Sequence, residues 1–191
     1  MTSQRGLLIV VSGPSGVGKD TVIKRLLELD PKLRYSVSYT TRPPRPGEVD
    51  GVDYRFVNKV EFERLIREDA LLEYATYDGH LYGTPIVPLD QARAAGYDIV
   101  LKIDVQGAEQ VRKRARDALR IFLAPPNMEE LLRRRTARHS ESPLDQTARQ
   151  LIAKDEMALA LHFDHVVIND DLERAVQGVL AIIRLARERH T

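Results

Sequence analysis

The stretch Leu7-Leu8-Ile9-Val10-Val11-Ser12 runs directly into Gly13-Pro14-Ser15-Gly16-Val17-Gly18-Lys19-Asp20-Thr21. Its first part is an apolar run of the length of a buried strand, and the apolar residues at 22–27 have helical spacing. The glycines between strand and helix let the backbone curl so that its N–H groups converge on an anion at the positive end of the helix. Lys19 adds a charge for terminal phosphates. This stretch therefore predicts a phosphate loop that binds a nucleoside triphosphate.

Composition narrows the classes of protein to consider. The chain has 191 residues, 43% hydrophobic and 30% charged, as expected of one soluble globular domain. A formal net charge of +1 provides no basic field for nucleic acid, so small phosphorylated ligands are the expected partners. No signal-peptide layout or membrane-length apolar run is visible, so we expect no membrane partner and a cytoplasmic location. Zero cysteines exclude disulfides and thiolate ligands, and the five histidines suggest no metal site.

Strand-like and helix-like segments alternate along the chain. Apolar runs with strand character occupy 7–12, 98–103, 119–123 and 165–168. Amphipathic stretches occupy 19–29, 107–117, 127–138 and 172–189. This alternation is typical of a parallel sheet between layers of helices. The predicted fold class is an α/β three-layer sandwich with a central parallel sheet, as in P-loop NTPases.

Two segments interrupt this alternation. Residues 35–97 are rich in Thr, Tyr and Pro, with short strand-like pieces, and predict an inserted mixed-β subdomain. Residues 138–150 are polar and contain His139-Ser140-Glu141-Ser142-Pro143, which predicts a mobile lid. We expect a single domain over 1–191, whose core comprises 1–34, 98–137 and 151–191.

The residue after the loop lysine departs from the usual pattern. A Ser or Thr hydroxyl normally stands there as a magnesium ligand, but this chain has Asp20, and the hydroxyl comes at Thr21. A step of about 100° around the helix prevents simple replacement of one by the other. Two interpretations remain open. Asp20 engages magnesium directly or through water while Thr21 faces an inner phosphate, or Asp20 only stabilises the helix terminus electrostatically.

Further charged residues gather outside the loop. Arg42 and Arg45 lie in a proline-stiffened stretch, where fixed guanidinium groups suit a second phosphate better than a solvated turn once a phosphate loop is present. Asp104 ends a buried strand, at the edge where such sheets bind ligands. Arg133-Arg134-Arg135-Thr136-Ala137-Arg138 and Arg149 flank the predicted lid. Some of these arginines form a solvated face, and one or two could stabilise a transferring phosphoryl group.

Taken together, these motifs resemble the guanylate kinase family from about residue 7 to Asp170. The matching segments stand in family order and at family-like spacing. They are Gly13-Pro14-Ser15-Gly16-Val17-Gly18-Lys19, Thr40-Thr41-Arg42 with Arg45-Pro46-Gly47-Glu48, Tyr82-Gly83-Thr84, Ile103-Asp104-Val105-Gln106-Gly107 and Val167-Ile168-Asn169-Asp170. The resemblance implies a magnesium-dependent enzyme that phosphorylates GMP with ATP.

The resemblance also implies the roles of individual residues. GMP would be bound by Ser38, Arg42, Arg45, Tyr54, Glu73, Tyr82, Thr84 and Asp104. ATP would be bound by Gly13, Pro14, Ser15, Gly16, Val17, Gly18, Lys19, Asp20, Thr21 and Asn169. Catalytic charge would come from Lys19, Arg42, Arg135, Arg138 and Arg149, and Asp20 is a candidate magnesium ligand. Carboxylates of Glu73 and Asp104 could accept from guanine's N1–H and amine, with Ser38 or Thr84 donating to O6; adenine lacks this pattern.

The sequence departs from the family pattern at three positions: Asp20, His139 where glycine is usual, and Lys102 where an acidic residue is usual. Lys102 could either favour the ionised form of Asp104 or contact a phosphate. One alternative function is a ribose 1,5-bisphosphate phosphokinase, which the Asp20-Thr21 pair favours mildly and the guanine-reading set opposes. The other is a non-enzymatic interaction module, which the intact Lys19 and loop glycines oppose.

Overall fold

Two sheets organise the computed structural model, which describes residues 4–136 and 155–190. The first has five strands in the order β2-β7-β1-β8-β9, and the second has four in the order β4-β3-β6-β5. Strands of the first sheet are β1 (Leu8–Ser12), β2 (Leu33–Tyr35), β7 (Asp98–Lys102), β8 (Leu119–Ala124) and β9 (His165–Ile168). Strands of the second are β3 (Tyr39–Thr40), β4 (Arg55–Phe56), β5 (Leu71–Tyr77) and β6 (His80–Pro85). The chain divides into two compact units, which we describe separately.

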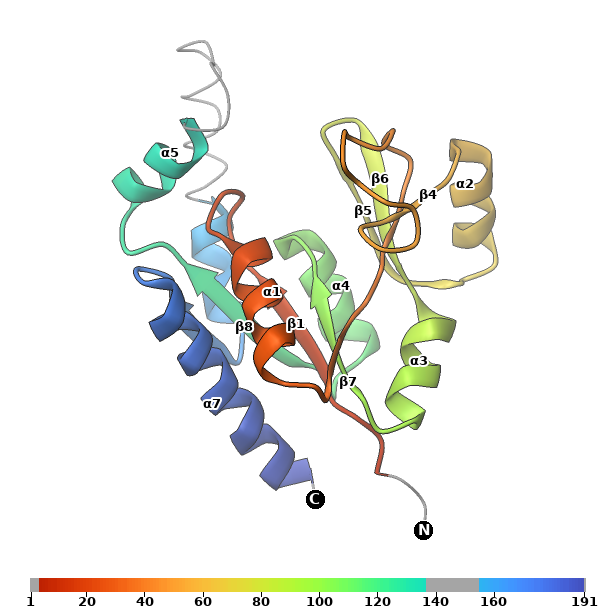
Figure 1. Ribbon diagram of the computed structural model, residues 1–191. Helices are drawn as coiled ribbons and strands as arrows, with labels where there is room; N and C mark the ends of the chain where they lie inside the picture. Colours follow the sequence, from red (N-terminus) through yellow and green to blue (C-terminus); the bar gives the residue numbers. More distant parts are fainter. Residues whose placement is uncertain (1–3, 137–154, 191) are drawn as a thin grey trace. The chain divides into compact units, whose positions relative to one another are not determined.

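The loop unit contains residues 9–31, 102–105 and those from 119 onward. In it β1 pairs with β8 and β8 with β9, all in parallel. Helices α1 (Lys19–Leu29) and α7 (Leu172–His190) lie on one face of these strands (Figure 1), joined by an ion pair of 2.9 Å from Arg25 to Glu173. On the other face Phe122 packs against Phe163, with ring centroids 5.2 Å apart. Strand β1 and most of β8 are therefore buried, whereas the edge strand β9 is largely exposed.

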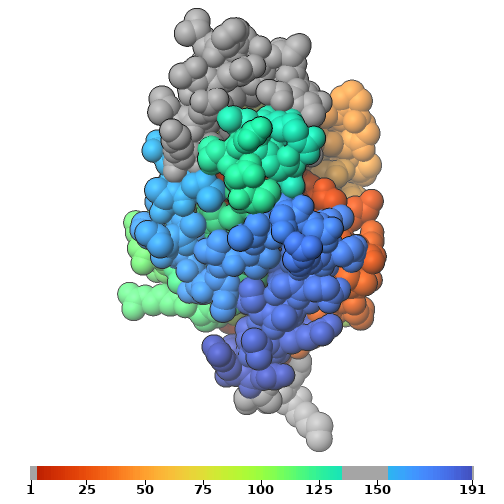
Figure 2. Space-filling view, turned by 90° about the vertical axis from the view of Figure 1, so that its left-hand side faces the viewer, coloured from red at the N-terminus to blue at the C-terminus, as the bar shows by residue number. Residues whose placement is uncertain are grey.

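Burial explains why strand β1 and helix α7 could be predicted from the sequence. All five residues of β1 are buried, which accounts for its continuous apolar run. Helix α7 instead buries one stripe, including Val176, Val179, Leu180 and Ile183, at helical spacing. Figure 2 shows the outer side of α7 next to α5 (Met128–Thr136) and the segment 155–168. The last helix thus anchors the unit through its inner stripe.

The second-sheet unit contains residues up to Leu8, 32–101 and 106–118. Its antiparallel β5–β6 hairpin turns at Asp78 and Gly79, both with positive φ, as a tight hairpin requires. Helix α2 (Lys59–Arg67) begins at Asn58, whose side chain accepts a hydrogen bond from the backbone of Glu61. Phe62 of this helix is buried in an apolar cluster beside the sheet. This cluster gives the second sheet a core of its own.

Two further helices belong mainly to this unit, α3 (Ile86–Ala94) and α4 (Val105–Arg114). Arg93 at the end of α3 is buried, and its guanidinium donates to the carbonyl of Gly6 at 2.9 Å and to Asp117 at 2.5 Å. Asp98, also buried, accepts from the backbone N–H of Leu7 at 2.7 Å. These buried charges are therefore paired, as their removal from water requires.

The α/β class with a central parallel sheet and a mixed-β subdomain is confirmed. Within 35–97 the sequence did not reveal α2 and α3, and β2 was also missed. The predicted lid, 138–150, lies outside the described residues. Among the helices of the described ranges, none is long and apolar enough to cross a membrane.

Candidate active site

The predicted phosphate loop connects β1 to α1. Gly13 has a φ of 144°, and a Cβ there would lie 2.2 Å from the carbonyl oxygen of Leu123 on β8. Gly18, with a φ of 101°, is the residue from which α1 starts. Both positions exclude other residues, the first by collision with backbone and the second by its left-handed conformation. The loop therefore ends at the positive end of a helix, where anions bind.

Lys19 is the first residue of α1 and lies back over the loop. Its Nζ donates to the carbonyl oxygens of Gly13 at 2.6 Å and Pro14 at 3.2 Å. Burial lowers the pKa of Lys19 from its ordinary value of 10.5 to about 8, although the carboxylates of Glu156 and Asp20 act in the opposite direction. Because this ammonium group has lost its hydrating water, its charged form would be stabilised by the negative charge of a bound phosphate.

Two side chains fix the back of the loop by binding the carbonyl oxygen of Val17. Asn169 donates through Nδ2 at 2.8 Å, and Arg134 donates through an N–H at 3.4 Å. Arg134 also donates to the carbonyl of Asn169 at 3.0 Å and to Glu130 at 2.7 Å. Sequence reasoning missed this role of Arg134; the only signal was its place in the basic run. It ties α5 to the phosphate loop.

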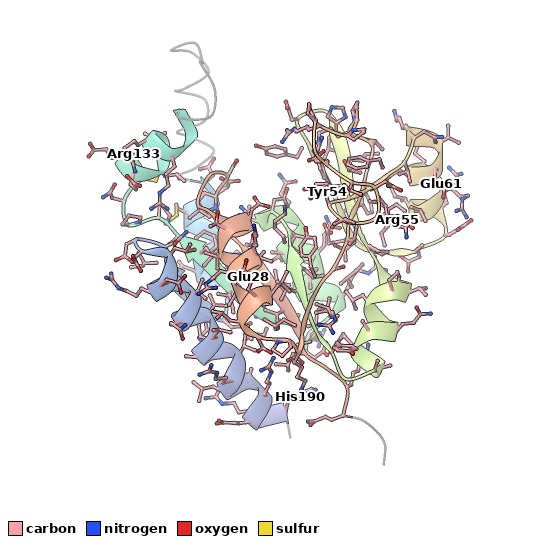
Figure 3. All side chains as sticks on the ribbon, viewed as in Figure 1. Glu28, Tyr54, Arg55, Glu61, Arg133 and His190 are labelled. Carbon is pink, nitrogen blue, oxygen red and sulfur yellow. The ribbon has the colours of Figure 1, made fainter. Side chains whose placement is uncertain are left out.

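The other arginines of α5 do not all share this position. Arg133 projects outward and pairs with Glu130 at 2.6 Å (Figure 3), so it belongs to the predicted solvated face. Arg135 lies on α5, but its side chain is outside what the structure describes, as are Arg138 and Arg149. The assignment of these three residues to ATP stays a prediction.

Asp20 and Lys102 form an ion pair beside the loop. Asp20 is the second residue of α1, and Lys102 is the last residue of β7. The Nζ of Lys102 donates to Oδ1 of Asp20. Two of the three departures from the family pattern are thus in contact with each other. Thr21, one residue further along α1, is exposed.

In the second-sheet unit, Arg42 lies at the centre of a compact polar cluster. Its guanidinium donates to both carboxylate oxygens of Glu48, at 2.7 and 3.0 Å, and lies 5.5 Å from the ring centroid of Tyr54. Tyr82 packs edge-on against Tyr54 and hydrogen-bonds Arg42. The structure therefore brings together Arg42, Tyr54 and Tyr82, three of the predicted GMP-binding residues, and adds Glu48 to them. Glu48 had been noticed only as part of a motif.

Arg45 is placed differently from Arg42. Its side chain is exposed, and its backbone N–H donates to Glu48 at 2.7 Å. The hydrogen bonds from Arg42, followed by the backbone bond from Arg45, hold the pKa of Glu48 below its usual value. The carboxylate of Glu48 thus binds both the guanidinium of Arg42 and the backbone of Arg45, and these contacts close the loop from Pro43 to Gly47.

The predicted base-reading residues of this unit are buried. The hydroxyl of Thr84 donates to Oε1 of Glu73 at 2.6 Å across the β5–β6 ladder, and Ser38 is buried as well. Asp104 follows β7 and belongs to the loop unit, where its carboxylate acts on Lys19. Buried polar groups arranged in this way suit a ligand that carries complementary hydrogen-bonding groups.

The donor set near the loop fits magnesium better than a protein-enclosed metal. In the described ranges, no group of three or more His, Cys, Asp or Glu side chains could hold a metal ion. Magnesium does not need such a group, because it keeps several waters and binds through one or two carboxylates together with substrate phosphates. The exposed carboxylate of Asp20 is a hard oxygen donor of this kind, and its role as a magnesium ligand stays a prediction.

A parallel sheet whose first strand ends in a glycine loop, with Lys19 over that loop, defines a P-loop nucleotide-binding protein. The sequence matches the guanylate kinase family profile over residues 5–186. The chain is 52% identical over 189 residues to a guanylate kinase of Thermus thermophilus, covering 99% of this chain and 84% of the relative. The chain therefore belongs to the guanylate kinase family.

Other relatives agree with this assignment. A guanylate kinase of Streptococcus agalactiae is 50% identical over 182 residues, covering 95% of this chain and 87% of the relative. The crystal structure of guanylate kinase from Anaplasma phagocytophilum superposes with a TM-score of 0.79 at 35% identity, covering 97% of this chain and 88% of that one. Shikimate kinase from Bacteroides thetaiotaomicron, at a TM-score of 0.54, 14% identity and coverage of 93% and 98%, shares the fold alone.

Proposed function

We propose that this protein transfers the terminal phosphoryl group of ATP to GMP, giving ADP and GDP. The observation that carries the proposal is the intact phosphate loop with Lys19 in a chain of the guanylate kinase family. An interaction module would not need that lysine. Both substrates are small nucleotides, so the reaction requires no nucleic acid or membrane partner. We infer that the enzyme acts in the cytoplasm, where both nucleotides are available.

The acceptor nucleotide would be recognised by the polar residues of the second-sheet unit. Glu73 would accept a hydrogen bond from the N1–H or the amine of guanine. Arg42, Arg45, Tyr54 and Tyr82 would hold the phosphate of GMP, with Arg42 already oriented by Glu48. A buried carboxylate facing the unprotonated N1 of adenine would lose its partner, at a cost of about 1 to 3 kcal/mol. This contrast supports GMP over AMP.

Phosphoryl transfer itself requires positioning and neutralisation of charge. An oxygen of the GMP phosphate forms the new bond to the γ-phosphorus of ATP, while the bond to the β,γ-bridging oxygen breaks and leaves ADP. The nucleophile is already anionic, so no general base is needed. Lys19 would neutralise the β- and γ-phosphates. When bound, magnesium supplies further neutralisation, and Asp20 is the carboxylate that would hold it, directly or through water.

The direct test is a coupled assay of ADP release with ATP, magnesium and three acceptors: GMP, AMP and ribose 1,5-bisphosphate. We expect turnover with GMP far above that with the other two. Turnover only with the sugar phosphate would overturn the proposal in favour of the ribose phosphokinase. Absence of turnover with all three would overturn it in favour of a binding function.

Replacing Glu73 with Gln should weaken discrimination for guanine. The amide oxygen can still accept from Thr84, so the fold is preserved, but the amide N–H₂ now meets a donor of guanine. We expect the KM for GMP to rise about 10- to 100-fold while the KM for ATP changes little. Glu68→Gln, on the exposed part of the same unit, is the matched control. An unchanged KM for GMP would remove Glu73 from the base-reading set.

Nucleotide binding should weaken at alkaline pH because of Lys19. Above its pKa of about 8, the nucleotide-free protein increasingly holds this side chain neutral, whereas a bound phosphate favours the ammonium form. Binding therefore takes up a proton, and affinity for ATP should fall by up to about tenfold per pH unit between pH 8 and about 9.5. Titration calorimetry in two buffers of different ionisation enthalpy measures the uptake. The dependence should vanish in Lys19→Met, and a similar slope there would contradict this assignment.

A further inference from the structure

The contact between Asp20 and Lys102 places two opposite charges at the entrance to the loop. The two side chains come from different elements, the start of α1 and the end of β7, and they differ in exposure. The carboxylate side chain is 69% exposed, so a hydrated metal ion can reach it, whereas the lysine side chain is only 20% exposed. The ammonium group is therefore delivered to Asp20 from the sheet side, along a largely buried stem.

Lys102 also lies within electrostatic range of Lys19. The two ammonium groups repel, while the carboxylates of Glu156, Asp20 and Asp104 act on Lys19 in the opposite sense. Two cations held close together beside a phosphate loop form a site for a polyanion. A lysine carries its charge on a flexible four-carbon stem, so its ammonium group can change partners without movement of the backbone. Lys102 thus has a second partner available once a nucleotide phosphate arrives.

Magnesium and Lys102 would compete for the same carboxylate. A hard dication prefers oxygen ligands, and an ammonium group bonded to Oδ1 occupies one of the oxygens that Asp20 can offer. The contact is partly exposed, and ion pairs of this kind are weak, so exchange is energetically accessible. If magnesium took Asp20 in the absence of a nucleotide, Lys102 would lose its contact with this carboxylate while still repelled by Lys19. A nucleotide phosphate would instead accept the ammonium group of Lys102.

We propose that Lys102 is the internal counter-ion of Asp20 and gives up this carboxylate to magnesium when a nucleotide phosphate receives its ammonium group. The inference rests on the proposed magnesium-nucleotide site and adds a residue to it. Lys102 makes the binding of metal and nucleotide interdependent. Asp20 changes partner from ammonium to metal, and Lys102 from carboxylate to phosphate.

The test measures binding rather than turnover. The dissociation constant of a fluorescent N-methylanthraniloyl-ADP is determined with saturating magnesium and with a chelator, and the ratio of the second constant to the first is the metal promotion. In Lys102→Met the diphosphate loses the ammonium group that it would receive once metal occupies Asp20. We therefore expect metal promotion to fall about tenfold, mainly through weaker binding in the presence of metal. Lys102→Arg should stay close to the wild type.

The Asp20→Asn variant separates this role from others. It should lower metal promotion, and adding Lys102→Met to it should cause no further change, because Lys102 would then contact phosphate with or without metal. Lys24→Met, which removes an exposed lysine of α1, is the matched control. Thermal melting of each variant confirms that it is folded.

Three results would overturn the proposal. One is a metal promotion in Lys102→Met that stays within twofold of the wild type. Another is an equal fall in metal promotion when Lys102→Met is added to Asp20→Asn. Either leaves the proposed function intact, since the wild type still binds the nucleotide. Failure of the wild type to bind N-methylanthraniloyl-ADP under both conditions would instead overturn the nucleotide site itself, together with this inference.

Discussion

Replacement of Lys19 by methionine is expected to reduce kcat for phosphoryl transfer to GMP by about 10³-fold, the scale observed when one transition-state donor is removed. The side chain lies over the loop, with its ammonium group on the carbonyls of Gly13 and Pro14. Methionine keeps most of the aliphatic length but removes the charge that neutralises the terminal phosphates. Steady-state kinetics with saturating ATP, GMP and magnesium measure the loss.

Lys24→Met serves as the control for Lys19→Met, because it removes an equal charge from an exposed position on the same helix. It should keep kcat within about twofold of the wild type, as surface substitutions usually do. If both variants keep the melting temperature of the wild type, a difference in kcat reflects the chemistry of the loop and not a loss of folding. A fall of less than about tenfold in Lys19→Met would mean that the loop lysine does not act on the transferring group.

Replacement of Arg42 by alanine should affect GMP selectively. Truncation of a largely buried, hydrogen-bonded charge removes the fork that would bind the acceptor phosphate and leaves Glu48 without its bidentate partner. We expect the KM for GMP to rise about 100-fold, since losses at such charge pairs run to several kcal/mol, while the KM for ATP changes less than about threefold. Both constants come from initial-rate measurements in which each substrate is varied at saturating levels of the other.

Two further variants sharpen the test of Arg42. Arg42→Lys restores the charge but not the planar fork, so it should recover only part of the affinity for GMP. Arg64→Ala removes an arginine that forms ion pairs on the exposed face of α2, and it should leave both KM values unchanged. Equal weakening of GMP and ATP in Arg42→Ala would show that Arg42 does not serve the acceptor phosphate alone.

The loop unit could be predicted from sequence because its signals are local. A strand buried on both faces must be apolar throughout, as β1 is, and glycine is the residue that fits where Gly13 approaches the backbone of β8. Helix α7 could be predicted because its buried apolar residues recur at helical spacing. In the second-sheet unit Glu73 and Thr84 were identified from the sequence only as separate candidates, and the structure pairs them across the β5–β6 hairpin.

Several features of the site could not be predicted from the sequence, because they depend on contacts between residues far apart in the chain. Arg134 resembles its neighbours in the basic run, and only the folded chain separates it from Arg133 by placing it on the loop carbonyl of Val17. The pairing of Lys102 with Asp20 joins residues 82 positions apart, which no local pattern encodes. Helices α2 and α3 were missed because Thr, Tyr and Pro around them suggested strands and turns. Glu48 was hidden in the same way, as one polar residue in a polar loop.

The hydrogen bond between Thr84 and Glu73 has one more consequence. Thr84 has a single hydroxyl proton, and it gives that proton to the carboxylate, so both side chains present only lone pairs to a ligand. Of the two candidates for donating to guanine O6, this leaves Ser38. With Glu73 and Thr84 both acting as acceptors, the two side chains suit a base edge with two donors, which guanine has and hypoxanthine, lacking the exocyclic amine, does not. The direction of one buried proton would thus make base recognition sensitive to the loss of a single amino group from the ligand.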